Sequence, residues 1–108
     1  MESKYLEAIS AYKVETDENV IKAEIASILD KHLEENRTPE VLRFLLSSID
    51  LTTLKSTDSM QSVSNFTERV NEFENEYGEL PSVAAICVYP CFAQVVRSVL
   101  EVSSVKIA

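Results

Sequence analysis

The sequence predicts an α/β fold preceded by a helical segment, and two observations lead to this expectation. Residues 1–48 show only the three- and four-residue spacing of apolar side chains that amphipathic helices have. Residues 49–108 instead alternate short runs rich in β-branched or apolar residues with helical stripes. Strands that alternate with helices form parallel sheets, so the second segment predicts parallel strands joined by helical crossovers.

The helical segment contains one strong helix signal, over residues 17–36. Apolar side chains recur there at spacings of three and four, and the acidic residues at its start suit the positive N-terminal end of a helix. Thr38 and Pro39 then predict the N-cap and the first position of another helix. A weaker stripe over residues 5–12 predicts one or two further turns. The strong stripe comprises Ile21, Ile25, Ile28, Leu29 and Leu33.

The second segment begins with a strand expected at Ile49–Leu54. The Ser, Thr and Asp at residues 56–58 are candidates for the N-cap of the following helix. The apolar stripe of that helix ends before Gly78, at the position where glycine commonly terminates helices. This stripe comprises Met60, Val63, Phe66, Val70, Phe73 and Tyr77.

A second strand is expected at Val83–Tyr89, where a nearly continuous apolar run stops at Pro90. Such a run is typical of a strand that is covered on both faces. A helix over residues 92–100 and a strand over Val105–Ala108 complete the order strand, helix, strand, helix, strand. Parallel strands in this order occur in doubly wound sheets and in barrels, and the pattern alone does not separate the two.

The charge of the chain argues against several classes of partner. The 10 Lys and Arg residues are outnumbered by 18 Asp and Glu residues, which gives a formal net charge of −8. Nucleic-acid-binding surfaces are usually basic, and an anionic membrane would repel this chain, so we expect neither partner. No apolar run approaches the roughly 20 residues of a membrane span. The N-terminus also lacks the apolar stretch of a signal peptide, so we expect a cytoplasmic protein.

Residues that commonly bind metals are few and scattered. Cys87 and Cys91 form a single Cys-x3-Cys pair, and His32, the only histidine, is distant in the sequence. A structural zinc site requires four ligands, so we expect no metal and interpret the cysteines as reduced, mostly buried thiols. His32 lies beside the helical stripe and is interpreted as a helix-edge residue.

Two of the expected strands resemble those of a known family. Ile49–Leu54 is similar to the first barrel strand of deoxyribose-phosphate aldolases, which carries an Asp-Leu-Thr-Thr-Leu signature, and Ala84–Pro90 resembles their second strand, with its Ala-Ile-Cys-Val-Tyr-Pro pattern. Val105–Ala108 is similar to the start of their third strand. The resemblance covers about residues 45–108. It implies a partial TIM (β/α)8 barrel, truncated after about three strands and preceded by a helical N-terminal extension at residues 1–48.

Alternation along each strand gathers the polar residues on one side. Asp50 and Thr52 share a side of the first strand, and Cys87 lies on the matching side of the second if the aliphatic sides meet helices. The resemblance implies that this side is the barrel interior, with Asp50, Thr52 and Cys87 lining the substrate pocket. Without the resemblance, Asp50 is more simply interpreted as a strand-edge carboxylate bonded to backbone groups.

The resemblance implies a class I aldolase that reversibly cleaves 2-deoxyribose 5-phosphate to acetaldehyde and glyceraldehyde 3-phosphate, without a metal or organic cofactor. In this family a lysine amine forms a Schiff base with the substrate, supported by a second lysine and an aspartate. Those residues and the phosphate-binding loops belong to later strands, so we expect this chain alone to lack catalytic residues and to be inactive. Lys106 is not expected to be a nucleophile, because nothing near it in the sequence would activate its amine.

Two expectations concern partners of the protein. The substrate of the complete aldolase would be a phosphorylated sugar. A barrel opened after three strands leaves unpaired strand edges and an uncovered apolar face, so we expect the chain to self-associate. The alternative is that the chain is a non-enzymatic acidic α/β module that binds a partner protein through its surface. Unlike the aldolase, such a module needs no further βα units.

Overall fold

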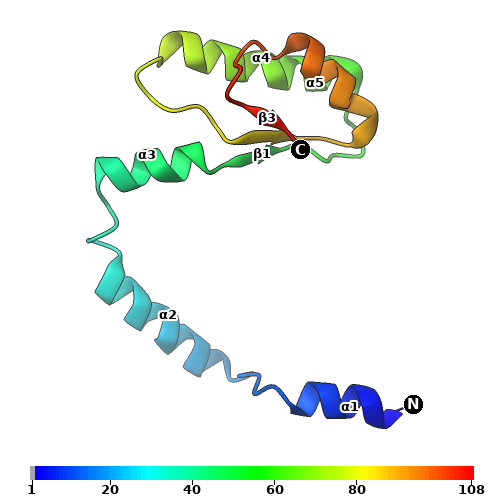
Figure 1. Cartoon of the computed structure of the whole chain (residues 1–108). Helices are drawn as coiled ribbons and strands as arrows, with labels where there is room; N and C mark the ends of the chain where they lie inside the picture. The colour runs from blue at the N-terminus through cyan, green and yellow to red at the C-terminus, as the bar shows by residue number, and fades with distance from the viewer. Residues whose placement is uncertain (1) are drawn as a thin grey trace. The chain divides into compact units, whose positions relative to one another are not determined.

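The computed structural model describes residues 2–108 and divides the chain into two compact units, Met1–Arg37 and Thr38–Ala108 (Figure 1). The first unit contains the helices α1 (Glu2–Ser10) and α2 (Glu18–His32). The second contains the helix α3 (Pro39–Ser47) followed by all the strands. The boundary expected at residue 48 also separates α1 and α2 from the sheet. It groups α3 with α1 and α2, however, whereas the structure places α3 in the same unit as the sheet. Among the described residues, no helix combines the length and apolar character needed to cross a membrane.

The helix α2 forms where the apolar stripe predicts it. Its N-cap is Asp17, whose side chain accepts a hydrogen bond of 2.9 Å from the backbone N–H of Asn19. Glu18 pairs with Lys22 one turn later at 3.2 Å, in the order along the chain that favours a helix. The helix ends at His32, earlier than the sequence predicts, and the chain continues in turns up to residue 36.

The helix α3 begins as its capping sequence predicts. The Thr38 hydroxyl accepts a hydrogen bond of 3.3 Å from the backbone N–H of Val41, and Pro39 occupies the first helical position. The Pro39 ring has no N–H to leave unpaired, so this position suits it. The predicted N-terminus of this helix is therefore confirmed, and α3 leads directly into the sheet.

Three short strands form one parallel sheet in the order β1-β2-β3, as the alternating pattern predicts. They are β1 (Asp50–Thr52), β2 (Ala85–Cys87) and β3 (Lys106–Ile107). Each is shorter than the run that predicted it, although residues just outside β1 also bond to the β2 segment: the Thr53 N–H donates to the Cys87 carbonyl, and the Ile49 carbonyl accepts from the Ala84 N–H. The first strand is an edge, the second is central and the third is the other edge.

Two helices cover one face of this sheet (Figure 1). They are α4 (Met60–Glu76), which connects β1 to β2, and α5 (Ala93–Val99), which connects β2 to β3 after a single 3-10 turn, η1 (Pro90–Phe92). The core lies between these helices and the sheet, and Val63, Ile86 and Val96 are fully buried there. The remaining buried apolar residues are Val70, Val88, Val102 and Val105.

The opposite face of the sheet, called here the open face, is covered by no helix of this unit. Along β2 the side chain of Ile86 is buried, whereas Ala85 and Cys87 are only partly buried. The expectation that the Val83–Tyr89 run is covered on both faces is therefore wrong for this chain. The reason is the two-residue period of a strand. Ile86 and the residues two positions before and after it point to the helix side, and the residues between them point to the other face.

Both termini of α4 differ in detail from the sequence prediction. Its N-cap is Ser59, which forms a capping box with Ser62, rather than one of residues 56–58. Asp58 instead accepts hydrogen bonds from the Thr53 hydroxyl at 2.8 Å and the Lys55 backbone N–H at 3.0 Å, and so closes the loop after β1. Gly78 follows the end of the helix as predicted, but it does not use the left-handed conformation that glycine usually supplies there.

Candidate functional site

The candidate site is the open face of the sheet, because the register gathers polar side chains there. Asp50 pairs with Ala85 and Thr52 pairs with Cys87, so these four side chains point to one side of β1 and β2. Leu51 and Ile86, which are also paired, point to the helix side. The predicted sorting of faces is confirmed in this respect, and it brings together Asp50, Thr52 and Cys87, the three residues expected to line a pocket.

The third strand adds a positive charge to the same face. Lys106 pairs with Ala85, which in turn pairs with Asp50, so the three residues form one row across the sheet. Strands lie about 4.8 Å apart, which places the first and last backbones of this row roughly 10 Å apart. Asp50 and Lys106 form no ion pair, since all the ion pairs within the described residues lie between residues 18 and 37. The small side chain of Ala85 leaves the space between them open.

Hydrogen bonds at the carboxyl ends of β1 and β2 fix the shape of the site. The Thr52 hydroxyl donates to the backbone carbonyl of Asp50 at 3.1 Å. The Tyr89 hydroxyl donates to the backbone carbonyl of Leu54 at 2.7 Å and so ties the loop after β2 to the loop after β1. Ligands of parallel α/β folds bind outside the carboxyl ends of the strands, which is where this tie lies.

The groups on the open face can bind a small polar ligand and take part in proton transfer. The Asp50 and Thr52 side chains are exposed, and Cys87 is partly buried. A carboxylate can accept a proton, a hydroxyl can donate or accept a hydrogen bond, and an ammonium group can hold an anion. Within the described residues no group of three or more His, Cys, Asp or Glu side chains comes together as a metal site would require.

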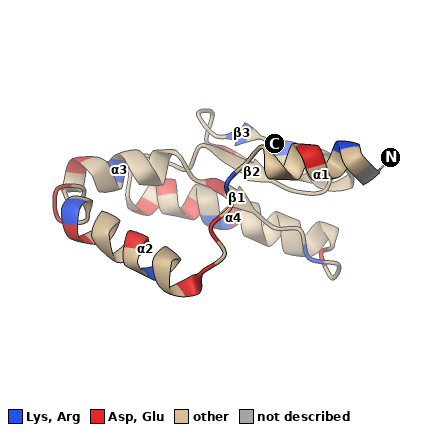
Figure 2. Ribbon diagram, turned by 90° about the horizontal axis from the view of Figure 1, so that it is seen from below, with Lys and Arg blue, Asp and Glu red and all other residues tan. Residues whose placement is uncertain are grey.

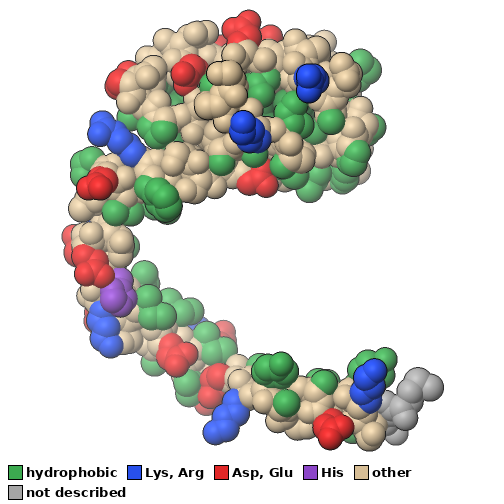
Figure 3. Space-filling model, in the orientation of Figure 1, with side chains coloured by type: hydrophobic (Ala, Val, Ile, Leu, Met, Phe, Trp, Pro, Cys, Tyr) green, Lys and Arg blue, Asp and Glu red, His purple; other side chains and the backbone are tan. Residues whose placement is uncertain are grey.

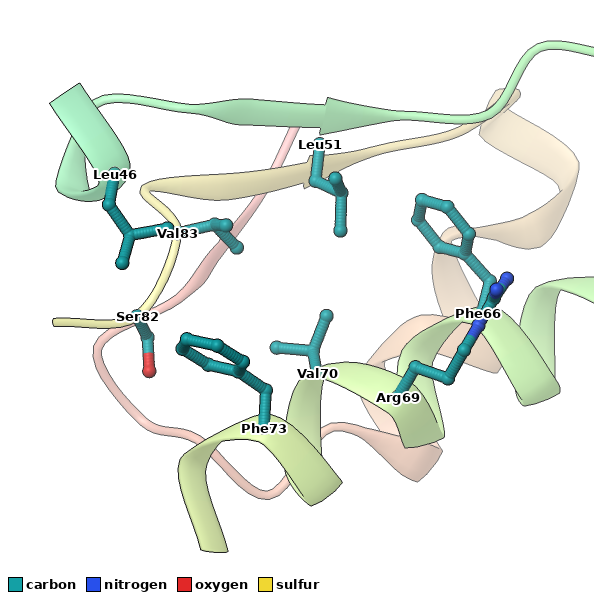
Figure 4. Close-up of a pocket in the computed structure, with 8 residues that line it drawn as sticks. All are labelled: Leu46, Leu51, Phe66, Arg69, Val70, Phe73, Ser82 and Val83. Atoms are coloured by element: carbon teal, nitrogen blue, oxygen red, sulfur yellow. The ribbon is translucent and has the colours of Figure 1, made fainter. Parts of the chain in front are cut away.

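A hollow of about 300 Å³ lies away from the open face, on the helix side of the sheet at the edge formed by β1. Figure 4 shows Leu51 pointing from β1 toward α4, with Val70 and Phe73 pointing back from the helix. Arg69 lies at one end, with its guanidinium 5.7 Å from the centre of the Phe66 ring. The other lining residues are Leu46, Ser82 and Val83. The lining is almost wholly apolar, so this hollow is suited to packing and offers no group for chemistry.

Asn71 and Thr67 are buried polar residues of α4 that the sequence pattern did not reveal. Asn71 is only 4% exposed, and its amide donates to the carbonyl of Val99 at 2.9 Å and accepts from the N–H of Glu101 at 2.9 Å. These bonds join α4 to the end of α5 and to the segment that follows it. The signal in the sequence is an asparagine directly after Val70, within the apolar side of the α4 stripe, where a polar residue needs a partner.

Comparison of the chain with protein-family models, curated proteins and solved structures finds no match.

Proposed function

We propose that this chain forms the first three strands of a class I deoxyribose-phosphate aldolase barrel. The complete enzyme would cleave 2-deoxyribose 5-phosphate to acetaldehyde and glyceraldehyde 3-phosphate through a lysine Schiff base. The observation that carries the proposal is the register of β1 and β2, which places Asp50, Thr52 and Cys87 together on the face without helices. Each belongs to one of the two strand sequences that resemble the aldolase family.

The arrangement of the layers supports the barrel. In a (β/α)8 barrel the helices lie outside, the strands are parallel, and strands that follow one another along the chain are neighbours in the sheet. The order β1-β2-β3, with α4 and α5 on one face, fits three consecutive units of this kind (Figure 1). The open face would then be the barrel interior, and the loops after β1 and β2 would lie at the end where barrel enzymes bind their substrates.

The chemistry of the open face fits the supporting roles of the proposed reaction. Asp50 would hold a water molecule or a protonated amine near the reacting carbon, and Thr52 would hydrogen-bond the substrate. Cys87 would line the pocket as a thiol. The Schiff-base lysine would come from a later strand, because Lys106 lies on an exposed edge strand with no second lysine paired beside it. A lysine needs a neighbouring cation or an apolar pocket to become a nucleophile near neutral pH.

The test is to join this chain to the later βα units of a deoxyribose-phosphate aldolase and to measure the cleavage of 2-deoxyribose 5-phosphate. We expect the fusion to fold cooperatively and to release glyceraldehyde 3-phosphate. The matched control replaces the Schiff-base lysine of the later units and should abolish the reaction. A fusion that folds cooperatively, as judged by circular dichroism and thermal unfolding, but shows no cleavage would contradict the proposal.

The second candidate function, a non-enzymatic module that binds a protein partner, is favoured by a different observation. Among the residues that the structure describes, 15 of the 20 large apolar side chains that are exposed precede residue 50, on or beside α1, α2 and α3 (Figure 3). Exposed apolar residues gathered in this way are typical of interaction surfaces. Binding through these helices is compatible with an enzymatic role for the sheet, because the two surfaces share no residues.

A further inference from the structure

The backbone ladder between β1 and β2 stops just beyond the two strands. The Thr53 N–H still donates to the Cys87 carbonyl at 3.0 Å. In a parallel ladder the next donor lies two residues further along, so the Lys55 N–H would bond the Tyr89 carbonyl. It donates instead to the Asp58 carboxylate at 3.0 Å. The loop after β1 therefore leaves β2 at this residue, at the end of the sheet where ligands of α/β folds bind.

A side chain takes the place of the missing ladder bond. The Tyr89 hydroxyl donates to the Leu54 carbonyl at 2.7 Å, across 35 positions of the sequence. Val88, directly before the tyrosine, is 5% exposed, so the backbone on that side is anchored in the core. Pro90, directly after it, begins η1 and takes the chain away from the sheet. The hydroxyl thus joins the two loops where the backbone no longer joins them.

Ion pairs do not hold the loops after β1 and β2 together in the part of the chain that the structure describes. Figure 2 shows acidic and basic residues interspersed along the ribbon, and every ion pair of these residues lies between residues 18 and 37. Among the same residues, the only side-chain hydrogen bond between residues 53–59 and residues 88–92 is that of Tyr89. The relative position of the two loops therefore depends on one neutral hydroxyl.

We propose that Tyr89 is a positioning residue of the open-face site, which fixes the carboxyl end of β1 through the Leu54 carbonyl. The inference rests on the proposed aldolase function, because it gives Tyr89 a task in that reaction. Thr52 lies two residues before Leu54, and Asp50 lies two residues before Thr52. Their side chains follow any movement of this end of the strand. A tyrosine side chain has only two rotatable bonds before its ring, so a hydrogen bond from its far end holds the loop firmly.

Amide hydrogen exchange in the whole chain tests the tie between the loops. Tyr89→Phe removes only the hydroxyl, so exchange at Thr53 and Lys55 should become about 5-fold faster, as expected for the loss of one neutral hydrogen bond. Ala84, whose N–H bonds at the other end of the ladder, should keep its rate. The matched control is Tyr77→Phe, because Tyr77 is 41% exposed and Tyr89 is 39% exposed. Unchanged exchange at Thr53 and Lys55 in Tyr89→Phe would overturn the proposal.

The kinetics of the fusion separate positioning from stability. In the chain joined to the later aldolase units, Tyr89→Phe should lower kcat for 2-deoxyribose 5-phosphate about 5-fold, because misplaced groups slow the reaction more than they weaken binding. KM should stay within about 2-fold and the Tm should not change, and Tyr77→Phe should leave all three unchanged. An active fusion in which Tyr89→Phe keeps the wild-type kcat would overturn this inference alone. A folded wild-type fusion without activity would overturn the proposed function and this inference with it.

Discussion

Asp50 and Lys106 face the same side of the sheet, with only the methyl group of Ala85 in the row between them. Parallel sheets usually carry aliphatic residues on both faces, because both faces are covered by other layers. Moving a carboxylate or an ammonium group into a dry layer costs several kcal/mol unless it is paired. The residues of the open face therefore favour contact with water or polar groups over an apolar contact with a further layer.

Asn71 should contribute measurably to the stability of the second unit through its hydrogen bonds. Asn71→Ala removes the side-chain hydrogen bonds to Val99 and Glu101, and so leaves the part-buried Val99 carbonyl and Glu101 N–H without these partners. We expect the free energy of unfolding to fall by about 2 kcal/mol, measured by urea denaturation. Asn75→Ala, at an exposed position of the same helix, is the control and should change it by less than about 0.5 kcal/mol. Equal effects of the two substitutions would show that the hydrogen bonds of Asn71 contribute nothing to the free energy of unfolding.

At the scale of elements, the sequence predicts the helices and strands well where a local signal decides them. Thr38 and Pro39 specify the start of α3 through their own chemistry, and the structure confirms both roles. The parallel order of the strands follows from the alternation of elements and is also confirmed. The cap of α4 was missed because Ser56, Thr57, Asp58 and Ser59 all have capping side chains. Asp58 does not cap the helix, because its carboxylate accepts hydrogen bonds from Thr53 and Lys55 in the loop after β1, and Ser59 is the N-cap instead.

A cap substitution distinguishes the structure from the sequence prediction. Ser59→Ala removes the capping box of α4 and should lower the free energy of unfolding by about 1 kcal/mol. Ser56→Ala removes a candidate cap that the structure does not use and should have little effect. Thermal or urea unfolding of the two variants, compared with wild type, checks this prediction. A larger loss in Ser56→Ala than in Ser59→Ala would mean that α4 begins earlier than the structure shows.

Tertiary packing explains what the sequence pattern could not predict about the faces of β2. The Val83–Tyr89 run is apolar throughout, yet only alternate residues are covered, because the helices of this unit lie on one side. A barrel truncated after three strands is expected to leave an uncovered apolar face on the sheet. The uncovered face instead bears Asp50, Thr52 and Lys106, and the exposed apolar residues gather on the N-terminal helices. The three candidate site residues could be grouped from the sequence because two-residue alternation is a local property.

At the scale of the whole molecule, an isolated chain should not form an imine in a site-specific way. Lys106 is exposed at the edge of the sheet and has no activating neighbour, so it should react with acetaldehyde no faster than the other exposed lysines. Borohydride reduction followed by peptide mass mapping measures the modification at each lysine. Lys106→Arg serves as the control and should lower the total labelling only by the share of one lysine among six. Stoichiometric labelling confined to Lys106 would place a nucleophile on this chain.

Among the residues of this chain, the proposed aldolase function gives the most testable role to Asp50. In the fusion that completes the barrel, the Asp50 carboxylate would lie in the barrel interior near the reacting carbon. The substitution Asp50→Asn keeps the shape of the side chain and one hydrogen-bond acceptor, but it removes the negative charge. General acid–base support is typically worth 10²- to 10⁴-fold, so a substantial part of the rate should depend on this group.

The most direct measurement is kcat/KM for 2-deoxyribose 5-phosphate in the fusion with and without Asp50→Asn, together with the Tm of both proteins. We predict that the substitution lowers kcat/KM by at least about 10-fold and leaves the Tm almost unchanged. Unchanged kcat/KM with a lowered Tm would contradict the account, because Asp50 would then stabilise the strand and take no part in a site.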